Sequence, residues 1–432
     1  MKIASLSPEQ APPIGVPLRF FALAPVFLLL AALVLAIGEG NPFSNVHSPA
    51  LLAATHCITL GFMAMVMLGA VQQVVPVIIG SQIPSLRLIA WLTMLPLMAG
   101  ALLLATGFTL GMPELLNFAW SLLGFTFLLF ISATLYSLAS ASAKNPTRTA
   151  ILLAVLSLAG AIILGMLLAR GYAAGLAIPF AKLATAHISL ALGGWVLLLI
   201  IGVSYQVVPM FQLTPNYPKW LADYLGPALF SALLLSLLPL LFEAAPRWPG
   251  IIAEIAYWIL ASSFAATTLK LQSQRRRRVP DATLSFFRIG MIALPIAALL
   301  SLTSIFPTAF SDHLRMLSVL FFILGFAVSV MQGMLYKIIP FLVWFHLFRG
   351  GASTATTRIP NMKEVIPEHW MWWHIKLHGG TLLAALLATW IDMAAWLVVF
   401  GLVLQGILLG FAILTGISVY HRTLIRIEQE SS

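Results

Sequence analysis

The stretch GFMAMVMLGAVQQVVP at residues 61–76 has two counterparts further along the chain. GWVLLLIIGVSYQVVP at 194–209 and GFAVSVMQGMLYKIIP at 325–340 share its spacing: a glycine, a second glycine eight residues later, and a proline seven residues after that. From one second glycine to the next, the separations are 133 and 131 residues. Such a period is too long for a solenoid repeat and is about the length of four membrane-spanning helices with their loops. We therefore predict one transmembrane domain, residues 1–432, made of three pseudo-repeated four-helix blocks.

The composition indicates the class of protein. Hydrophobic residues make up 61% of the chain and charged residues 8%, and the mean hydropathy is +1.01. Soluble domains carry about 25% charged residues, so an all-α polytopic membrane protein is predicted. Apolar runs of about 20 residues give twelve spans, with the repeat stretches in the second, sixth and tenth: 18–38, 51–79, 86–108, 115–139, 148–170, 181–209, 222–242, 249–271, 284–306, 313–346, 371–391 and 394–419.

The positive charges predict the orientation of the chain. Most lysines and arginines of this +10 chain fall in the tails and in loops on the same side as the tails, including four consecutive arginines at 275–278. The opposite loops keep mainly Arg170, Lys182, Arg247 and Arg315. By the positive-inside rule we expect a multi-pass protein of a bacterial-type inner (plasma) membrane with both termini cytoplasmic. The arginine run then lies beside anionic lipid, and no nucleic-acid partner is expected.

Two features exclude whole classes of function. The single cysteine, Cys57, excludes internal disulfides and cysteine-based zinc or iron–sulfur sites. Nearly every acidic residue lies in a predicted loop or tail; Glu254 near the start of the eighth span and Asp392 in a tight turn come closest to the interior. The spans therefore lack the Asp/Glu chain expected of a proton pump or a carboxylate-driven transporter.

Histidines are the intramembrane residues that suggest chemistry. His56, His187 and His313 lie in the repeat-equivalent spans, 5, 7 and 12 residues before the first repeat glycine, so the first two are close to equivalent. Neutral imidazole suits haem iron or copper. Alternatively, these side chains only form hydrogen bonds between helices, and His313 lies at a helix start in contact with water.

A metal-binding imidazole needs a second polar contact on its other ring nitrogen. The candidates are the hydroxyls of Thr55, Thr59, Ser189 and Thr185, or a backbone carbonyl.

A second pair of histidines lies in the eleventh predicted span. His374 and His378 are four residues apart and share one helical face. They are candidate cofactor ligands. The alternative is an interfacial position, because Trp370, Trp372 and Trp373 around them read equally well as an aromatic belt.

The overall pattern resembles the haem–copper oxidase subunit I superfamily. Twelve spans in three blocks, with histidines on the second and sixth helices, are the shared features. Two sequence segments are similar to short, divergent members of that group: THCITLGFMAMVMLGAVQQVVPVIIG at 55–80 and AHISLALGGWVLLLIIGVSYQVVPMFQLTPNYP at 186–218. They are more loosely similar to the NnrS family of haem- and copper-binding membrane proteins tied to nitric oxide metabolism.

The resemblance implies roles for two residues and excludes one reaction. Helix 2 of the oxidases supplies an axial ligand to the low-spin haem, matched by His56, and helix 6 supplies a copper ligand, matched by His187. The oxidase histidine pair on helix 7 is missing from 222–242, and the tenth span offers only His313 and His346 at its ends. The standard three-histidine copper site cannot be built, so proton-pumping oxygen reduction is not expected.

Three functions remain open from the sequence. The leading hypothesis is a haem b-binding membrane protein that serves electron transfer or nitric oxide and respiratory stress handling, with a cytochrome c or quinol-linked respiratory partner. His56 would be the first axial ligand and His378 or His313 the second; any enzyme activity would be that of an oxidoreductase. The second hypothesis is a haem-free transporter handling copper through His56, Cys57 and His187. The third is a non-catalytic subunit of a respiratory complex.

Overall fold

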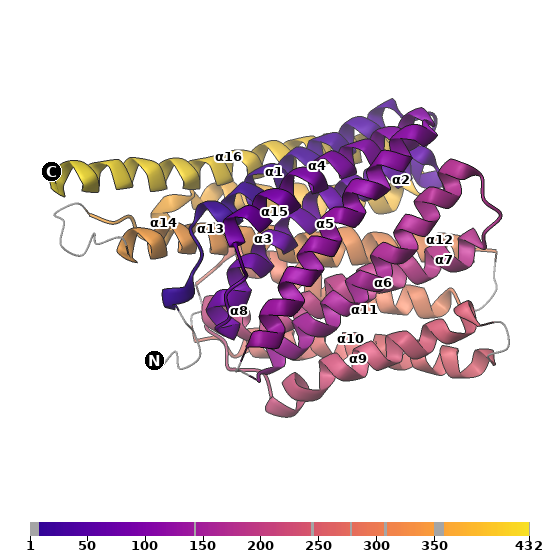
Figure 1. The fold of residues 1–432 in the computed structure, drawn as a ribbon. Helices are drawn as coiled ribbons and strands as arrows, with labels where there is room; N and C mark the ends of the chain where they lie inside the picture. Colours follow the sequence, from indigo (N-terminus) through magenta and orange to yellow (C-terminus); the bar gives the residue numbers. More distant parts are fainter. Residues whose placement is uncertain are drawn as a thin grey trace.

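The computed structural model describes residues 8–141, 144–242, 246–276, 279–305, 309–349 and 358–431. Lys2, Arg277, Arg278 and residues 350–357 of the predicted loop after Arg349 lie outside them. Within the described residues all regular structure is helical. The long helices run side by side along one axis, and the first short helix and the end of the last long one lie at the same end of the bundle (Figure 1).

The helices of the first block and a half are η1 (Pro8–Gln10), α1 (Gly15–Ile37), η2 (Pro42–Ser44), α2 (Pro49–His56), η3 (Cys57–Ala64), α3 (Met65–Val74), η4 (Val75–Ile79), α4 (Leu86–Leu110), α5 (Pro113–Ser140), α6 (Pro146–Ala174), α7 (Phe180–Ile188), η5 (Ser189–Val196) and α8 (Leu197–Gln212). The remainder are α9 (Lys219–Leu241), α10 (Arg247–Ser273), α11 (Ala282–Thr303), α12 (Ser311–Leu320), η6 (Phe321–Val328), α13 (Ser329–Arg349), α14 (Met362–Val365), α15 (Glu368–Ala388) and α16 (Asp392–Ser431).

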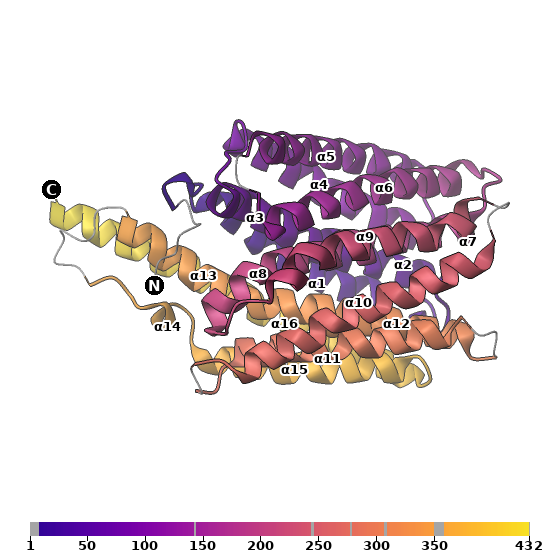
Figure 2. The ribbon, with the colours of Figure 1, turned by 90° about the horizontal axis from the view of Figure 1, so that it is seen from below.

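Eleven continuous helices of the described residues are long and apolar enough to cross a membrane, which confirms a polytopic membrane protein. Each coincides with a predicted span. The remaining predicted span, 371–391 (the eleventh in chain order), forms α15, whose composition is too polar to qualify because it carries Glu368, Lys376 and three histidines. It nevertheless packs lengthwise against α16 (Figure 2). An even number of passes, with α15 included, accounts for η1 and the end of α16 lying at one end of the bundle (Figure 1).

The three repeat helices share an unusual local structure. Each contains an eight-residue π-helical segment, η3, η5 or η6, which begins 19, 20 and 19 residues before Pro76, Pro209 and Pro340 respectively. A π turn inserts an extra residue into the helix and is often found at functional sites. His56 is the residue directly before η3, and His187 lies two residues before η5. In the third helix Leu320 takes the place of His56, so His313 is not its counterpart.

The first repeat glycine lies inside each π segment and lets the helix approach its predecessor. An added Cβ would lie 2.0 Å from Phe27 Cδ1 at Gly61, 2.4 Å from Ser157 Cβ at Gly194 and 2.8 Å from Ala293 Cβ at Gly325. These contacts come from α1, α6 and α11, the helix immediately before the repeat helix in every block. Small residues at such crossings let helix backbones pack closely in membranes, so each block is built on the same helix pair.

In the third block, an ion pair also joins α13 to the residue directly before α11. The Lys337 ammonium lies 2.9 Å from Asp281 Oδ2, and both side chains are about three-quarters buried. Asp281 also caps α11, accepting hydrogen bonds from the Thr283 amide and hydroxyl. Burial alone would raise the pKa of the Asp281 carboxyl, but the hydrogen bonds from Thr283 and Lys337 and the Lys337 charge outweigh it, so the pKa is lowered.

We expect Gly61→Ala to destabilise the protein by about 1–3 kcal/mol, because the new methyl group would overlap the Phe27 ring and its Cβ. The matched control is Gly380→Ala in α15, where an added Cβ meets nothing within 4 Å and helix propensity improves by up to about 1 kcal/mol. Thermal unfolding in detergent measures both. Equal melting temperatures for the two variants would contradict the packing argument.

The Asp281 ion pair predicts a stability that depends on pH. A carboxyl whose folded pKa is lowered contributes its full stability above its ordinary pKa, about 4, and loses it as the pH falls through the lowered value. Asp281→Asn keeps a helix cap but removes the charge. The melting temperature of this variant should be below that of the wild type at neutral pH and should converge with it in acid. Parallel curves at all pH values would argue against the ion pair.

Candidate functional site

His56 is held in one tautomer by its own helix. Its Nδ1 lies 2.7 Å from the Leu52 carbonyl oxygen. A carbonyl only accepts hydrogen bonds, so Nδ1 carries the proton and Nε2 keeps its lone pair. No described residue forms a hydrogen bond with Nε2. The Phe108 ring of α4 packs 5.7 Å from the imidazole and in turn touches Tyr172 of α6. The only nitrogen of His56 that can bind a metal is therefore unoccupied by protein.

His187 repeats this arrangement with a carbonyl from a neighbouring helix. Its Nδ1 lies 2.8 Å from the Ala161 oxygen of α6, and again Nε2 has no partner among the described residues. Gly165, one turn further along α6, leaves room for the ring: a Cβ there would lie 2.9 Å from His187 Cε1. His56 and His187 thus share one hydrogen-bond pattern, in which Nδ1 lies on a backbone carbonyl and Nε2 has no partner among the described residues.

The second polar contact of each ring comes from a backbone carbonyl, one of the two kinds of partner proposed from the sequence. The threonine hydroxyls do not provide this contact. Thr59 and Thr185 donate instead to the carbonyls of Thr55 and Ala181 in their own helices. An imidazole with Nδ1–H on a carbonyl and a free Nε2 is the usual state of a histidine that ligates a metal or haem iron. His56 and His187 both have this hydrogen-bond state.

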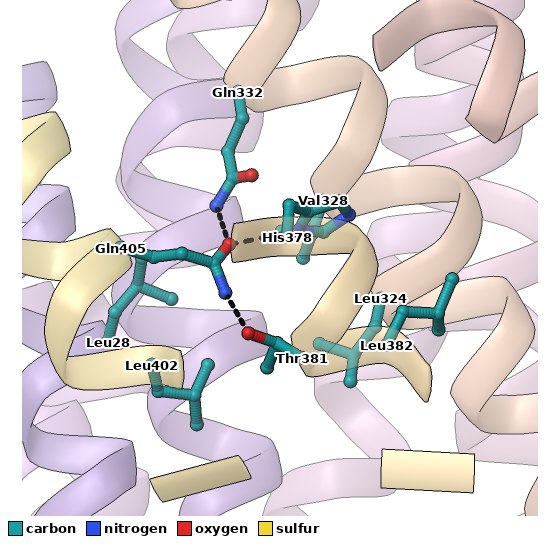
Figure 3. A pocket seen from close by; sticks show the side chains of 9 residues that line it. All are labelled: Leu28, Leu324, Val328, Gln332, His378, Thr381, Leu382, Leu402 and Gln405. Atoms are coloured by element: carbon teal, nitrogen blue, oxygen red, sulfur yellow. Dashed lines mark hydrogen bonds between the residues drawn. The ribbon is translucent and has the colours of Figure 1, made fainter. Parts of the chain in front are cut away.

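His378 belongs to a separate, fully buried network between α13, α15 and α16. Gln405 of α16 donates its amide to Thr381, whose hydroxyl donates to the Leu377 carbonyl. This fixes Gln405 Oε1 as the atom facing His378 Nδ1, at 2.9 Å. Nδ1 therefore carries the proton, and Nε2 accepts from the Ser329 hydroxyl at 2.6 Å. Figure 3 shows Gln405 between His378, Thr381 and Gln332.

His374 lies one turn from His378 and is also buried. Its Nδ1 is 2.8 Å from the Tyr336 hydroxyl, and the edge of the Phe286 ring packs on it at 5.4 Å. Its Nε2 and the Oε1 of Gln332 are buried without a hydrogen-bond partner. The cavity beside this network, lined by His378, Gln332, Gln405 and Thr381, offers only about 10 Å³ to the centres of water molecules, the lower limit for one water.

This second group does not fit a haem as it stands. Both ring nitrogens of His378 have protein partners, and the neighbouring cavity has no room for a porphyrin. The alternative of an interfacial position for His374 and His378 stays a prediction; both side chains face the interior of the bundle, with exposed fractions of 0% and 2%. Their role in the described structure is to join three helices through hydrogen bonds, which stabilise helix association in membranes.

His313 and His346 have other partners. His313 Nε2 contacts Thr389 at 3.2 Å, at the far end of α15 from His374, and its ring lies 4.0 Å from Trp390. His346 lies at the end of α13 with its ring nitrogens near the carbonyls of Leu342 and Pro12. Within the described residues no three His, Cys, Asp or Glu side chains come together as a metal site.

Comparisons with known proteins do not assign the chain. Neither the protein-family models nor the curated proteins include a match to it. Its function must therefore be argued from the two histidine groups.

Sequence reasoning missed the residues that complete the second group. Gln405 and Gln332 are amides inside apolar spans and are 1% and 0% exposed. An amide in the middle of a predicted span is as costly to bury as a neutral imidazole, and this signal was available. Histidine is a common metal ligand and was therefore singled out, whereas the partner that fixes the His378 tautomer is an amide.

Gln405→Leu is expected to destabilise the protein by about 1–3 kcal/mol, because it leaves His378 Nδ1–H and the Gln332 amide buried without an acceptor. Replacing His378 by Leu as well removes the stranded donor. The double variant should therefore be more stable than the sum of the two single changes predicts, by about 0.5–3 kcal/mol. Thermal or denaturant unfolding of the four proteins tests this, and strict additivity would show that the two side chains do not interact.

Proposed function

We propose that this chain is a haem b-binding integral membrane protein that acts in electron transfer or in nitric oxide and respiratory stress handling. The observation that carries the proposal is the state of His56. Its Nδ1–H is donated to the Leu52 carbonyl, and its Nε2 has no protein partner. A carbonyl acceptor orients the ring and makes Nε2 a better donor of its lone pair to a metal.

The residues favour haem over a metal ion held by protein alone. A structural or catalytic metal site needs three or four protein ligands, and no such cluster exists among the described residues. Haem brings four nitrogens of its own, so iron needs only one or two side chains. His56 and His187 meet that requirement, since each presents one unpartnered Nε2.

His187 decides which chemistry the site supports. When bound, haem with one imidazole and an open position binds nitric oxide or oxygen, whereas two imidazoles suit electron transfer. His187 can serve either as the second ligand or as a polar group beside the open position. The Ala161 carbonyl holds its ring in place in both cases, and the Phe108 ring of α4 packs against His56.

The same two imidazoles also support the copper-handling alternative, with Cys57 next to His56 in the chain. Cys57 is 1% exposed, and its thiol lies among apolar side chains. The haem assignment makes fewer demands on the protein. Metal analysis separates the two proposals, because purified protein containing copper without iron would favour the transporter.

The test is an ultraviolet–visible spectrum and a pyridine haemochrome of protein purified from a haem-sufficient host. Wild type should show a Soret band and a b-type haemochrome, and His56→Ala should lose both. His187→Ala should either lose the band or change the response of the iron to nitric oxide. His47→Ala, in an exposed loop at the same end of the bundle, is the matched control and should keep the wild-type spectrum.

Melting temperatures of all four proteins check that each variant is folded. A folded wild type without a Soret band, or a folded His56→Ala variant with an unchanged one, would rule out the haem site. If the protein instead co-purifies with a cytochrome c- or quinol-oxidising complex and His56→Ala leaves that assembly intact, the non-catalytic subunit is the better assignment.

A further inference from the structure

A second cavity lies at the opposite end of the bundle from the chain termini, between the loop after α1 and the beginning of α16. It offers about 110 Å³ to the centres of water molecules, which is room for several waters or a small organic group. Gly38 and Gly40 form one wall, and Asp392 and Trp396 form the other. An added Cβ at Gly40 would meet nothing within 4 Å. The space is therefore open at the loop.

Asp392 is the one charged side chain in the walls of this cavity. Asn41 donates its amide to Asp392 Oδ1 at 2.9 Å and to the Ala388 carbonyl at 2.7 Å. These bonds fix the carboxylate between the two loops. Its Oδ2 has no hydrogen-bond partner among the described residues, so one carboxylate oxygen remains available to a ligand.

The surroundings of Asp392 favour a positive ligand. The two helix ends beside the cavity have opposite signs, because the carbonyl end of α1 at Ile37 attracts cations and the N–H end of α16 at Asp392 attracts anions. The negative charge of the cavity wall therefore comes from the Asp392 carboxylate. The Trp396 ring adds an aromatic surface of the kind that binds ammonium groups. No lysine or arginine lines the space.

The cavity also lies where lipid head groups are expected. Trp390 and Trp396, on either side of Asp392 in the chain, are 62% and 56% exposed. Exposed tryptophans at helix ends mark the boundary between the apolar core of a membrane and water. Met393, also in the cavity wall, is 73% exposed on the same surface.

We propose that this cavity binds the head group of a zwitterionic lipid that ends in a primary ammonium, of the phosphatidylethanolamine type. The ammonium donates a hydrogen bond to Asp392 Oδ2 and packs against Trp396, while the acyl chains lie along the exposed apolar surface of α16. A primary ammonium has the N–H donors that a carboxylate oxygen accepts, whereas a trimethylammonium group has none. This inference does not depend on haem binding.

The experiment is native mass spectrometry of the purified full chain with three added lipids that share acyl chains and differ in head group: ethanolamine, choline and glycerol. Wild type is compared with Asp392→Asn and Glu39→Gln. Asparagine at 392 can still accept from Asn41, so the loop contact is kept while the charge is lost. Glu39→Gln is the matched control, because Glu39 is an exposed carboxylate in the same loop that does not line the cavity.

Wild type and Glu39→Gln should retain the ethanolamine lipid about tenfold better than the glycerol lipid, the effect of about 1.4 kcal/mol. Asp392→Asn should lose this preference at an unchanged melting temperature. Equal retention of the three lipids by wild type, or an unchanged preference in Asp392→Asn, would overturn the proposal. Free ethanolamine is added to wild type in a parallel titration, and retention of it at the level of the ethanolamine lipid would also overturn the proposal, because the cavity would then be a site for a soluble amine.

Discussion

Ring nitrogens and amides inside a membrane-spanning bundle must find their hydrogen-bond partners within the protein, because the lipid core offers none. This constraint gives the same residue type two different roles here. In His56 and His187, Nδ1–H donates to a backbone carbonyl and Nε2 has no protein partner. In His378 both ring nitrogens are hydrogen-bonded, because Nδ1–H donates to Gln405 and Nε2 accepts from Ser329. The first arrangement leaves an electron pair on Nε2 without a protein partner, and the second joins three helices.

The free pair is positioned by the repeat architecture. In each block a glycine inside a π segment brings the repeat helix against the helix before it. Each repeat helix therefore packs against the same neighbour within its own block. Two of the repeat helices carry a histidine one or two residues before the π segment, and the third carries Leu320 directly before it. In the third block, polar side chains of α13 form hydrogen bonds with α15 and α16 instead.

Much of the candidate site followed from residues that are unusual in a membrane span. His56, His187, His374 and His378 were singled out partly by that argument, and the structure places His374 and His378 side by side on one buried helix face. The pairing itself was not predictable. The proposal that His56 and His378 bind one cofactor rested on helix number and depth. The direction of each side chain also depends on the π segments, because they change the rotation per residue along the helix. The sequence does not predict where these segments lie. The orientation of Gln405, and with it the tautomer of His378, depends on a chain of hydrogen bonds through Thr381 to Leu377.

The sequence by itself determined that this is an all-α membrane protein with a repeat of about 132 residues, because apolar length and the glycine–proline spacing are local properties of the chain. It also determined which residue types lie inside the bundle. Only the tertiary structure decided which ring nitrogens remain free, since that depends on whether a carbonyl or a polar side chain from another helix lies within hydrogen-bond distance. It likewise decided that Asp392 and Asn41, about 350 residues apart in the chain, form the wall of one cavity.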